Sequence, residues 1–346
     1  MERPQSDSAA TAPVDPVPTA TTMRAIVQDT YGDADRLRLD QIAVPAVGVD
    51  DVLIRVRAAG VHIGDWHVMT GQPYLMRIMG FGFRAPKARV RGMDVAGTVA
   101  AVGANVTRFG VGDQVYGTCD GAFAEYATAR IATLAAKPAS LKFEQAAAIP
   151  TSGCTALQAL RDAGKITAGQ RVLIIGASGG VGLFAVQIAK AFGAEVTGVC
   201  SAAKVELVHS VGADHVIDYT ETDVTANEQR YDLVLVMGGD RTLSQLRRCL
   251  AARGTLVLVG GEGGGRLIGG AMVRSLRAVA VSPFVKQNLR MVLGTTTSKD
   301  LQALTALIDS GKINPVIDHN YPLSEAADAI RHLHTGRAKG KLVITV

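Results

Sequence analysis

The sequence from Arg171 to Gly182 reads Arg-Val-Leu-Ile-Ile-Gly-Ala-Ser-Gly-Gly-Val-Gly and decides the fold. Residues 172–175 form a short apolar run, which is typical of a strand buried on both faces of a sheet. The glycine-rich segment that follows predicts a tight turn. Phe184, Ile188 and Phe192 then recur every four residues, which predicts a helix with one face packed on that strand. A strand, a glycine turn and a helix in this order predict a dinucleotide site.

The turn has the form A-x-G-x-x-G, with Ala177, Gly179 and Gly182 at the three fixed positions. Glycines at such a turn let backbone N–H groups approach a phosphate, and the amino end of a helix adds partial positive charge. The hexamer alone fits an ordinary glycine-rich connection equally well, whereas the surrounding alternation of strands and helices favours a cofactor site. The residues expected to bind the phosphates are Ser178, Gly179, Gly180 and Val181.

From residue 172 to residue 259, strand-like apolar runs alternate with helical segments, which predicts a doubly wound parallel α/β domain. The pattern then predicts helical segments from 283 to about 293, over 301–310 and over 324–334. A closing apolar strand over 340–346 is expected to return to the first domain, because the parallel sheet already has enough strands. Later strand ends are expected to line the dinucleotide groove, at Gly238, Gly239, Val259 and Gly260.

The chain before residue 147 has short strands separated by glycine, which predicts a small β-barrel-like domain. Residues 23–27 and 37–40 indicate a hairpin within it. An irregular insertion over 69–91 is long for a connector, and long loops are often lids or binding loops; its aromatic residues would pack onto the domain equally well. Residues 1–22 have no apolar period and are expected to be a disordered tail.

Composition narrows the function classes. The formal net charge is +5 without a long basic run, so nucleic-acid binding is not expected. No apolar stretch approaches the roughly 20 residues of a membrane span, and we expect no signal peptide. The four cysteines show no C-x-x-C spacing, which favours reduced thiols in a cytoplasmic protein over disulfides or a four-cysteine zinc lobe.

Four motifs in this order resemble the zinc-independent, quinone oxidoreductase-like branch of the medium-chain dehydrogenase/reductase superfamily. They are Arg-Gly-Met-Asp-Val-Ala-Gly-Thr-Val at 91–99, Ala-Ser-Gly-Gly-Val-Gly at 177–182, Gly-Ala-Asp-His-Val-Ile-Asp-Tyr at 212–219 and Gly-Arg-Ala-Lys-Gly-Lys-Leu-Val-Ile at 336–344. The resemblance covers residues 23–346. It implies an α/β fold with a GroES-like, β-rich catalytic domain over 23–147 and 287–346, a Rossmann domain that binds NADP over 148–286, a cleft between them and a homodimer.

The end of the second cofactor-domain strand bears on which nicotinamide cofactor is used. NAD-preferring Rossmann domains place Asp or Glu there, but this chain has Ser201. Ser201 can donate to a 2′-phosphate, and Lys204 adds a cation at the same helix start; the alternative is an N-cap serine and a solvated lysine. The resemblance also implies that Tyr219 contacts that phosphate and that Thr155 contacts the nicotinamide. Phe284 is expected to form an apolar wall of the site. The cofactor predicted is NADP(H).

The resemblance also raises the question of a metal. In zinc alcohol dehydrogenases of the superfamily the catalytic metal takes Cys, His and Cys, and the matching residues here are His62, Met93 and Thr151, with Asp94 in the acidic slot. Thioether and hydroxyl groups are not usual zinc ligands. We therefore expect no metal, and a reaction other than zinc-assisted alcohol oxidation.

Candidates for the catalytic chemistry lie mainly in the sequence Val-His-Ile-Gly-Asp-Trp-His at 61–67. His62 stands where the metal would be and is the candidate proton donor, with Asp65 beside it. His67 matches a relay position whose linking hydroxyl is replaced by glycine. Tyr74 is a second candidate donor if its loop folds over the cleft. The residues expected to line the substrate pocket are Trp66, His67, Phe81 and Phe83.

Without a metal, the protein must position an electrophile against the nicotinamide and polarise it by hydrogen bonds. The function predicted is hydride transfer from NADPH to a quinone or an α,β-unsaturated carbonyl, both small molecules. One alternative is an enoyl-thioester reductase, with Arg84, Lys87, Arg89 and Arg91 as a basic patch for a carrier phosphate. Another is an NADPH-binding sensor or RNA-binding relative with little turnover.

Overall fold

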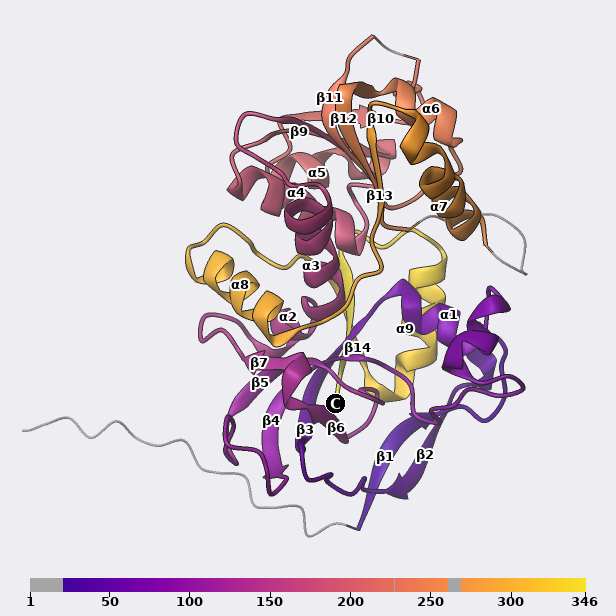
Figure 1. Ribbon diagram of the computed structural model, residues 1–346. Coiled ribbons are helices and arrows are strands. Elements are labelled where there is room, and N and C mark those ends of the chain that lie inside the picture. The colour runs from indigo at the N-terminus through magenta and orange to yellow at the C-terminus, as the bar shows by residue number, and fades with distance from the viewer. Residues whose placement is uncertain (1–20, 227, 261–268) are drawn as a thin grey trace, which may run out of the picture.

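The computed structural model describes residues 21–226, 228–260 and 269–346. The chain forms two lobes, each built on its own sheet, with α2 (Phe143–Ala147) and α3 (Pro150–Leu157) where they meet (Figure 1). The predicted two-domain α/β fold is confirmed. A disordered tail was predicted over residues 1–22, of which residues 1–20 lie outside the described residues. Strand β1 (Thr22–Val27) begins at residue 22, the last residue of that predicted tail.

The cofactor lobe contains a six-stranded sheet in the order β10-β9-β8-β11-β12-β13, in which every neighbouring pair is parallel. The order reverses next to β8, which is the arrangement of a doubly wound Rossmann sheet. The strands are β8 (Arg171–Ile175), β9 (Glu195–Cys200), β10 (His215–Asp218), β11 (Tyr231–Val236), β12 (Leu250–Leu258) and β13 (Asn288–Met291).

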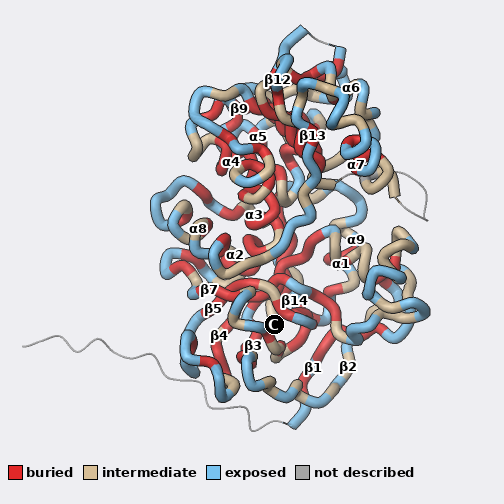
Figure 2. Tube along the Cα trace, viewed as in Figure 1, coloured by how far each residue is buried: buried red, intermediate tan, exposed pale blue. Residues whose placement is uncertain are grey.

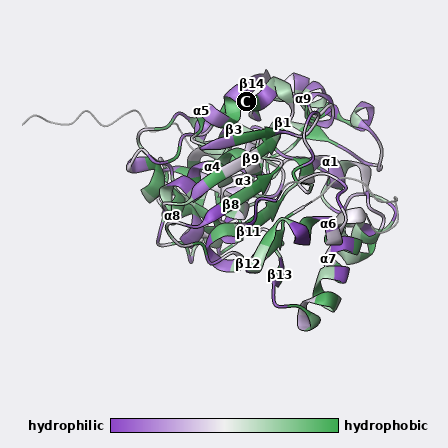
Figure 3. Cartoon of the chain, turned by 90° about the horizontal axis from the view of Figure 1, so that it is seen from above, coloured by the Kyte–Doolittle hydropathy of each residue, from purple (hydrophilic) through white to green (hydrophobic). Residues whose placement is uncertain are grey.

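Helices cover both faces of this sheet, because successive side chains of a strand point to opposite sides. Val172 and Ile174 of β8 pack in one core with Phe184 of α4. Leu173 and Ile175 pack in the opposite core, with α6 and α7. Figure 2 shows the sheet buried between these layers, and Figure 3 shows the apolar colour of β8, β11 and β12. The helices are α4 (Gly180–Ala191), α5 (Val205–Ser210) after η5 (Ala202–Lys204), α6 (Leu243–Arg248) and α7 (Gly270–Val281) followed by η6 (Ser282–Phe284).

The catalytic lobe is built on a seven-stranded sheet in the order β14-β15-β3-β4-β5-β7, with β6 also paired to β3. The C-terminal strand β15 lies between β14 and β3, which confirms the expected return of the chain to this lobe. The predicted hairpin is confirmed as well, since β1 pairs antiparallel with β2. The strands are β2 (Arg38–Ala43), β3 (Asp51–Val61), β4 (Asp94–Val102), β5 (Gln114–Thr118), β6 (Tyr126–Arg130), β7 (Leu134–Ala136), β14 (Ile317–Pro322) and β15 (Lys341–Thr345).

One predicted element is wrong. The segment after residue 283 was expected to be helical to about 293, but β13 occupies 288–291 and extends the parallel sheet beside β12. A short apolar run does not distinguish strand from helix by its period, and here tertiary pairing decides. The sheet of the cofactor lobe therefore continues past the expected boundary at residue 287.

The remaining helical elements surround the two sheets. The helices expected near 301–310 and 324–334 are confirmed as α8 and α9, and α9 packs on α1 and β15. Within the described ranges, the model contains no helix with both the length and the apolar character that a bilayer crossing requires. These elements are η1 (Ala34–Arg36), α1 (Ile63–Thr70), η2 (Arg77–Phe81), η3 (Ile131–Thr133), η4 (Gln158–Ala163), α8 (Ser298–Asp309), η7 (Leu323–Glu325) and α9 (Ala326–His334).

Candidate active site

The glycine turn that opens α4 is shaped by contacts that exclude side chains. Gly176 has φ +87°, a region that favours glycine. A Cβ on Gly182 would lie 2.2 Å from the carbonyl oxygen of Gly176, so only glycine fits there. Gly179 caps α4, and the first N–H groups of this 12-residue helix have no partner within the helix. Ser178, Gly179, Gly180 and Val181 thus stand where the sequence analysis placed a phosphate, at a helix amino end.

The carboxyl ends of the neighbouring strands meet at the same edge. A Cβ on Gly176 would lie 3.4 Å from the backbone nitrogen of Gly238, which follows β11. Arg274 of α7 holds the Gly239 carbonyl at 2.9 Å. The N–H groups of Val259 and Gly260 both donate to the Val236 carbonyl, which places the end of β12 beside that of β11. The structure therefore brings these four predicted groove residues together, namely Gly238, Gly239, Val259 and Gly260.

Phe284 does not join this edge, contrary to the expectation. It precedes β13, and the amino ends of parallel strands lie at the opposite edge of the sheet from the glycine turn. Its side chain is 86% exposed. The segment that does reach the groove edge is the one after β13, where a Cβ on Gly294 would lie 2.0 Å from the Thr155 hydroxyl oxygen. Thr155 is buried in α3 against that segment, at the junction of the two lobes.

The three residues predicted to bind a 2′-phosphate follow two neighbouring strands, Ser201 and Lys204 after β9 and Tyr219 after β10. Ser201 begins η5 in extended conformation, and its side chain makes no capping hydrogen bond. The ammonium of Lys204 donates to the Gly336 carbonyl of the catalytic lobe at 2.8 Å, and burial lowers the pKa of Lys204. The backbone N–H of Tyr219 donates to the Cys200 carbonyl, so the half-exposed Tyr219 lies beside the same strand end. The structure thus gathers Ser201, Lys204 and Tyr219 around one point.

A buried lysine that the sequence analysis did not single out joins the two lobes. Lys341, at the start of β15, is 3% exposed and donates to the Val61 carbonyl at 2.9 Å and to the Ser152 hydroxyl at 3.1 Å. Its ammonium lies 3.9 Å from the Asp94 carboxylate. Burial lowers the pKa of Lys341, and Asp94 opposes that shift. A Cβ on Gly180 would be 3.0 Å from Cδ of Lys341, so this side chain lies against the phosphate-binding turn.

His62 and Asp65 form a buried pair at the start of α1. The backbone N–H of His62 donates to the Asp65 carboxylate at 2.9 Å, and Nδ1 of His62 lies 3.7 Å from the same oxygen. Burial raises the pKa of Asp65, while His62 opposes the shift. Within the described chain, Nε2 of His62 is buried and has no hydrogen-bond partner. Asp65 therefore orients a histidine whose outer nitrogen is available to a ligand.

Trp66 and His67 each contact another part of the catalytic lobe. The Trp66 ring stacks on His334 of α9, with centroids 4.6 Å apart. Nδ1 of His67 lies 2.8 Å from the Gln72 carbonyl, with which it hydrogen-bonds. Both side chains thus help to fix the packing of α1, and their role as pocket walls stays a prediction.

The loop after α1 holds its aromatic residues near the surface. The guanidinium of Arg77 lies over the rings of Tyr31 and Tyr74, at 4.3 and 4.6 Å from their centroids. The Tyr31 hydroxyl donates to the carbonyls of residues 81 and 82, which pins the loop to the lobe. Tyr74, Phe81 and Phe83 are 36%, 39% and 71% exposed. Their side chains are open to solvent in this structure, so it does not bring them to His62.

The four basic residues considered for a carrier phosphate do not form one patch. Arg89 pairs with Asp29 at 2.7 Å on the surface, whereas Arg91 is buried. Arg84 and Lys87 are exposed. Three of the four side chains are therefore exposed and Arg91 is not, so the four do not share one surface.

Arg91 is a second residue whose place in the site the sequence analysis missed. It is 4% exposed, and its Nε and Nη2 atoms have no hydrogen-bond partner among the described residues. Burial lowers the pKa of Arg91, and the nearby Asp65 carboxylate opposes the shift. The sequence did offer one sign of this buried position: Arg91 is a charged residue that directly precedes Gly-Met-Asp, where β4 begins.

The residues in the superfamily's catalytic zinc positions do not fit zinc. The Thr151 hydroxyl donates to the Asp94 carboxylate at 2.5 Å, and Met93 offers only a thioether. Burial raises the pKa of the Cys119 thiol well above its ordinary value, so no thiolate is supplied from the neighbouring strand. Across the described ranges, no three His, Cys, Asp or Glu side chains gather as a metal site would require.

Fold and site together define a class: a two-domain nicotinamide-dependent oxidoreductase with its cofactor turn at the junction of the lobes. Two family models match, one described as an alcohol dehydrogenase GroES-like domain over residues 48–139 and one as a zinc-binding dehydrogenase over residues 211–344. The chain belongs to the medium-chain dehydrogenase/reductase superfamily, in its quinone oxidoreductase-like branch.

Relatives support that placement. A 2-methylene-furan-3-one reductase of Solanum lycopersicum is 34% identical over 93% of this chain and 79% of its own. An NADPH-dependent alkenal/one oxidoreductase of Arabidopsis thaliana, described as chloroplastic, is 33% identical over the same shares. Among solved structures, the quinone oxidoreductase from Coxiella burnetii superposes with a TM-score of 0.82 at 30% identity, covering 94% of this chain and 99% of its own.

Proposed function

We propose that the chain is an NADPH-dependent reductase of small α,β-unsaturated carbonyls or quinones. The observation that carries the proposal is the second strand end, where Ser201 and Lys204 stand in place of an acid beside the glycine turn. An acid there would accept from a ribose hydroxyl, whereas a serine and a lysine suit a 2′-phosphate. The names of the two plant relatives and of the Coxiella protein describe this same chemistry.

The residues present fit a dinucleotide phosphate. The turn at 178–181 offers backbone N–H groups, and Tyr219 and Lys204 are the residues proposed to contact a 2′-phosphate. The cofactor, when bound, would supply a hydride, which carries both electrons of the reduction. Thr155 is proposed to position the nicotinamide, since it lies buried where the lobes meet.

The chain's own residues must then polarise the substrate and deliver a proton. His62 is the proposed proton donor, because its Nε2 atom is buried and unpartnered among the described residues. Asp65 accepts the His62 backbone N–H and lies 3.7 Å from Nδ1, so it orients the ring. Tyr74 would need its loop to move, and it remains the second candidate donor.

We propose that this reaction needs no metal. The support is the donor set: the Thr151 hydroxyl is engaged by Asp94, and Met93 offers only a thioether. Hydride transfer to a conjugated carbonyl does not require an alkoxide to be stabilised by zinc, unlike alcohol oxidation. Metal content measured on active enzyme tests the point, and stoichiometric zinc that is required for turnover would refute it.

The experiment that tests the function is NADPH oxidation with a panel of quinones, enones and enals, run in parallel with NADH. We expect turnover with NADPH and a clear preference over NADH. Tight NADPH binding without turnover on any of these compounds would favour the sensor alternative. Turnover confined to enoyl thioesters would favour the enoyl-thioester reductase.

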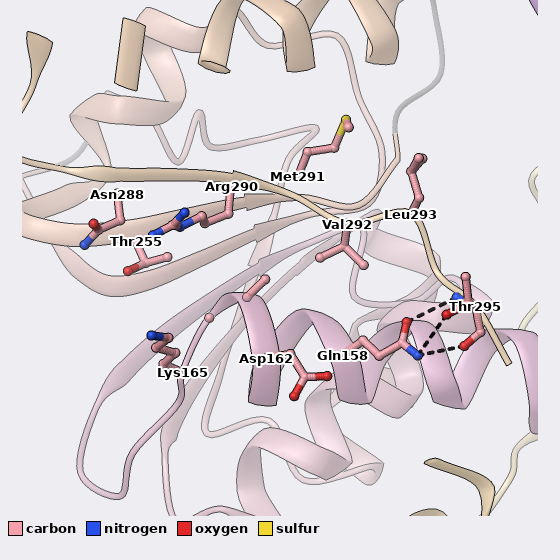
Figure 4. A pocket seen from close by; sticks show the side chains of 12 residues that line it. Gln158, Asp162, Lys165, Thr255, Asn288, Arg290, Met291, Val292, Leu293 and Thr295 are labelled. Carbon is pink, nitrogen blue, oxygen red and sulfur yellow. Dashed lines mark hydrogen bonds between the residues drawn. The ribbon is translucent and has the colours of Figure 1, made fainter. Parts of the chain in front are cut away.

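We also propose a homodimer formed through β13. This strand is an edge of the parallel sheet, with β12 as its partner in the described chain, and an unpaired edge is a template for another strand. Met291, Leu293 and Leu276 expose apolar side chains on or near it. Beside the strand lies a groove of about 800 Å³ (Figure 4), lined by Gln158 and Asp162 on one side and by Asn288 and Arg290 on the other.

Two further proposals concern organisation and place. The lobes are proposed to divide near residue 147 and again after β13, which moves the second boundary from 287 to beyond Met291.

The cytoplasm is the proposed compartment, supported by the four buried thiols among the described residues, none of which forms a disulfide. No nucleic-acid or membrane partner is proposed. Fractionation of the source cells would test the compartment.

A further inference from the structure

The Arg91 guanidinium is a buried charge without a partner. Its side chain is 4% exposed, and Nε and Nη2 donate no hydrogen bond within the described residues. Burying a charge without a partner is costly, and such groups are normally paired or bound to a ligand. Its backbone is fixed, since the N–H donates to the Ile26 carbonyl and the carbonyl accepts from the Phe123 N–H. The backbone that carries this side chain is therefore held on both sides.

The nearest negative group does not satisfy this charge. Asp65 is the first opposite charge that acts on Arg91, but its carboxylate accepts the His62 N–H. No ion pair joins Arg91 to a carboxylate in the described chain. Asp65 thus acts on the Arg91 guanidinium only through its charge, and the Nε and Nη2 donors of Arg91 remain without an acceptor among the described residues.

The strand register places Arg91 at the edge of the catalytic lobe that faces the cofactor turn. Gly60 of β3 pairs with Asp94 of β4, so the residues just beyond the end of β3 lie beside those just before β4. β15 begins at the same edge, because its second residue pairs with Val61. Its first residue, Lys341, lies against Gly180 of the phosphate-binding turn. Arg91 and His62, both with unused nitrogens, therefore lie on this one edge.

We propose that Arg91 donates hydrogen bonds to the carbonyl oxygen of the substrate and holds the enolate oxygen that forms during reduction. This inference rests on the proposed function. Hydride adds to the β-carbon as a new C–H bond, the C=C electron pair moves to the bond between the α-carbon and the carbonyl carbon, and the C=O π pair moves onto oxygen. NADPH is oxidised to NADP⁺, and the enolate then takes a proton at the α-carbon, from His62 or water, to give the saturated carbonyl.

The physical reason is differential binding. A neutral carbonyl compensates a buried guanidinium only in part, whereas a developing enolate oxygen compensates it fully. The interaction is therefore stronger in the transition state than in the ground state, which is the condition for raising kcat rather than only lowering KM. The reacting carbonyl, and not a separate carboxylate, is the group that Arg91 recognises.

The test compares Arg91→Met and Arg91→Lys with the control Arg89→Met, which removes a surface guanidinium two residues away. With a simple enone such as a methyl vinyl ketone, we expect Arg91→Met to lower kcat about 100-fold, with KM changed much less. NADPH affinity should stay within about twofold. Arg91→Lys should recover part of kcat, since it restores charge without the planar fork. Methylguanidinium added to Arg91→Ala should restore part of the rate.

A second measurement does not depend on turnover. Binding of p-nitrophenolate, an oxyanion with a visible absorbance, to the NADP⁺-loaded enzyme should weaken at least tenfold in Arg91→Met. It should stay unchanged in the Arg89→Met control. If Arg91→Met fails to fold, Arg91→Lys and the phenolate measurement still decide the question.

The outcomes separate this inference from the proposed function. If the parent enzyme reduces enones and Arg91→Met does so with kcat within threefold, the assignment of Arg91 is overturned while the function stands. A loss seen only with carboxylate-bearing enones also overturns it. If the parent reduces no enone or quinone, the proposed function fails, and unchanged phenolate binding in Arg91→Met would then overturn the oxyanion site as well.

Discussion

The ammonium of Lys204 in the cofactor lobe donates a 2.8 Å hydrogen bond to the carbonyl oxygen of Gly336 in the catalytic lobe. Lys204 also ends η5, the short helix that Ser201 caps on the proposed 2′-phosphate side of the dinucleotide groove. A phosphate bound there offers a charged acceptor in place of a neutral carbonyl, and charge-assisted hydrogen bonds are the stronger kind. The same lysine thus links the recognition of the cofactor to the contact between the lobes.

Replacing Ser201 by Asp together with Lys204 by Ala should reverse the cofactor preference. The double variant loses a hydroxyl donor and a cation, and it gains a carboxylate that repels a 2′-phosphate but accepts from a 2′-hydroxyl. We expect the Kd for NADPH to rise about 100-fold while that for NADH changes far less, measured by nicotinamide fluorescence. Lys299→Ala on the exposed side of α8 serves as the control. Equal losses for both cofactors would refute the 2′-phosphate assignment.

Two glycines of the turn should respond differently to alanine. A Cβ on Gly182 would lie 2.2 Å from a backbone carbonyl, so Gly182→Ala should destabilise the fold by about 1–3 kcal/mol and lower Tm. A Cβ on Gly179 meets its nearest atom at 3.5 Å, and φ there is −77°. Gly179→Ala should therefore keep Tm within about 2 °C yet weaken NADPH binding, because the methyl group occupies the approach of the phosphate. A Tm loss in Gly179→Ala equal to that in Gly182→Ala would contradict the prediction.

The buried ammonium of Lys341 should leave a mark on alkaline stability. Burial lowers the pKa of Lys341 below its ordinary value of 10.5, so over the interval between the two pKa values the unfolded chain binds more protons than the folded one. Stability then rises with pH through that interval, as the cost of the buried charge is relieved. We expect the unfolding free energy of the parent to rise relative to that of Lys341→Met as pH climbs toward 10.5, measured by urea unfolding. Parallel curves for the two proteins would refute it.

Charges on the β13 edge should abolish the proposed dimer. Met291→Lys with Leu293→Glu places charge at the exposed apolar positions next to the unpaired strand edge. We expect the molar mass, measured by light scattering after size-exclusion chromatography, to fall from twice the mass of the chain to that of a single chain. Val111→Glu, at an exposed apolar position of the other lobe, should leave the mass unchanged. A monomeric parent, or a dimer that survives both substitutions, would rule out this interface.

Local patterns in the sequence predicted the parts of the site that depend on local geometry. The phosphate turn at 176–182 requires glycine for reasons set by backbone contacts within a few residues, and the structure shows those contacts. The position of Ser201 directly after β9 could be predicted because it depends only on where one apolar strand ends.

The rest depends on contacts between distant parts of the chain. Lys341 becomes part of the site because β15 pairs with β3. Its ammonium then donates to the carbonyl of Val61, which is 280 residues earlier in the sequence. Arg91 is buried near Asp65 of α1 and Tyr31, both distant from it along the chain, and its unpartnered state among the described residues depends on this packing. Phe284 was misplaced because the course of α7, which carries the chain to the far edge of the sheet, cannot be read from its sequence. Trp66 packs on His334 for the same long-range reason.

The position of β15 between β14 and β3 sets an order for folding during synthesis. The strands of the cofactor lobe are contiguous from β8 to β13, so the ribosome completes that sheet while the catalytic lobe still has a gap beside β3. Domains generally fold as units as they emerge, and pairing of distant segments is slow. Residues 58–61 of β3, which pair with β15, therefore lack that partner until the last residues are made, whereas residues 51–55 can already pair with β6. Early binding of a dinucleotide by the finished lobe would precede any ability to reduce a substrate.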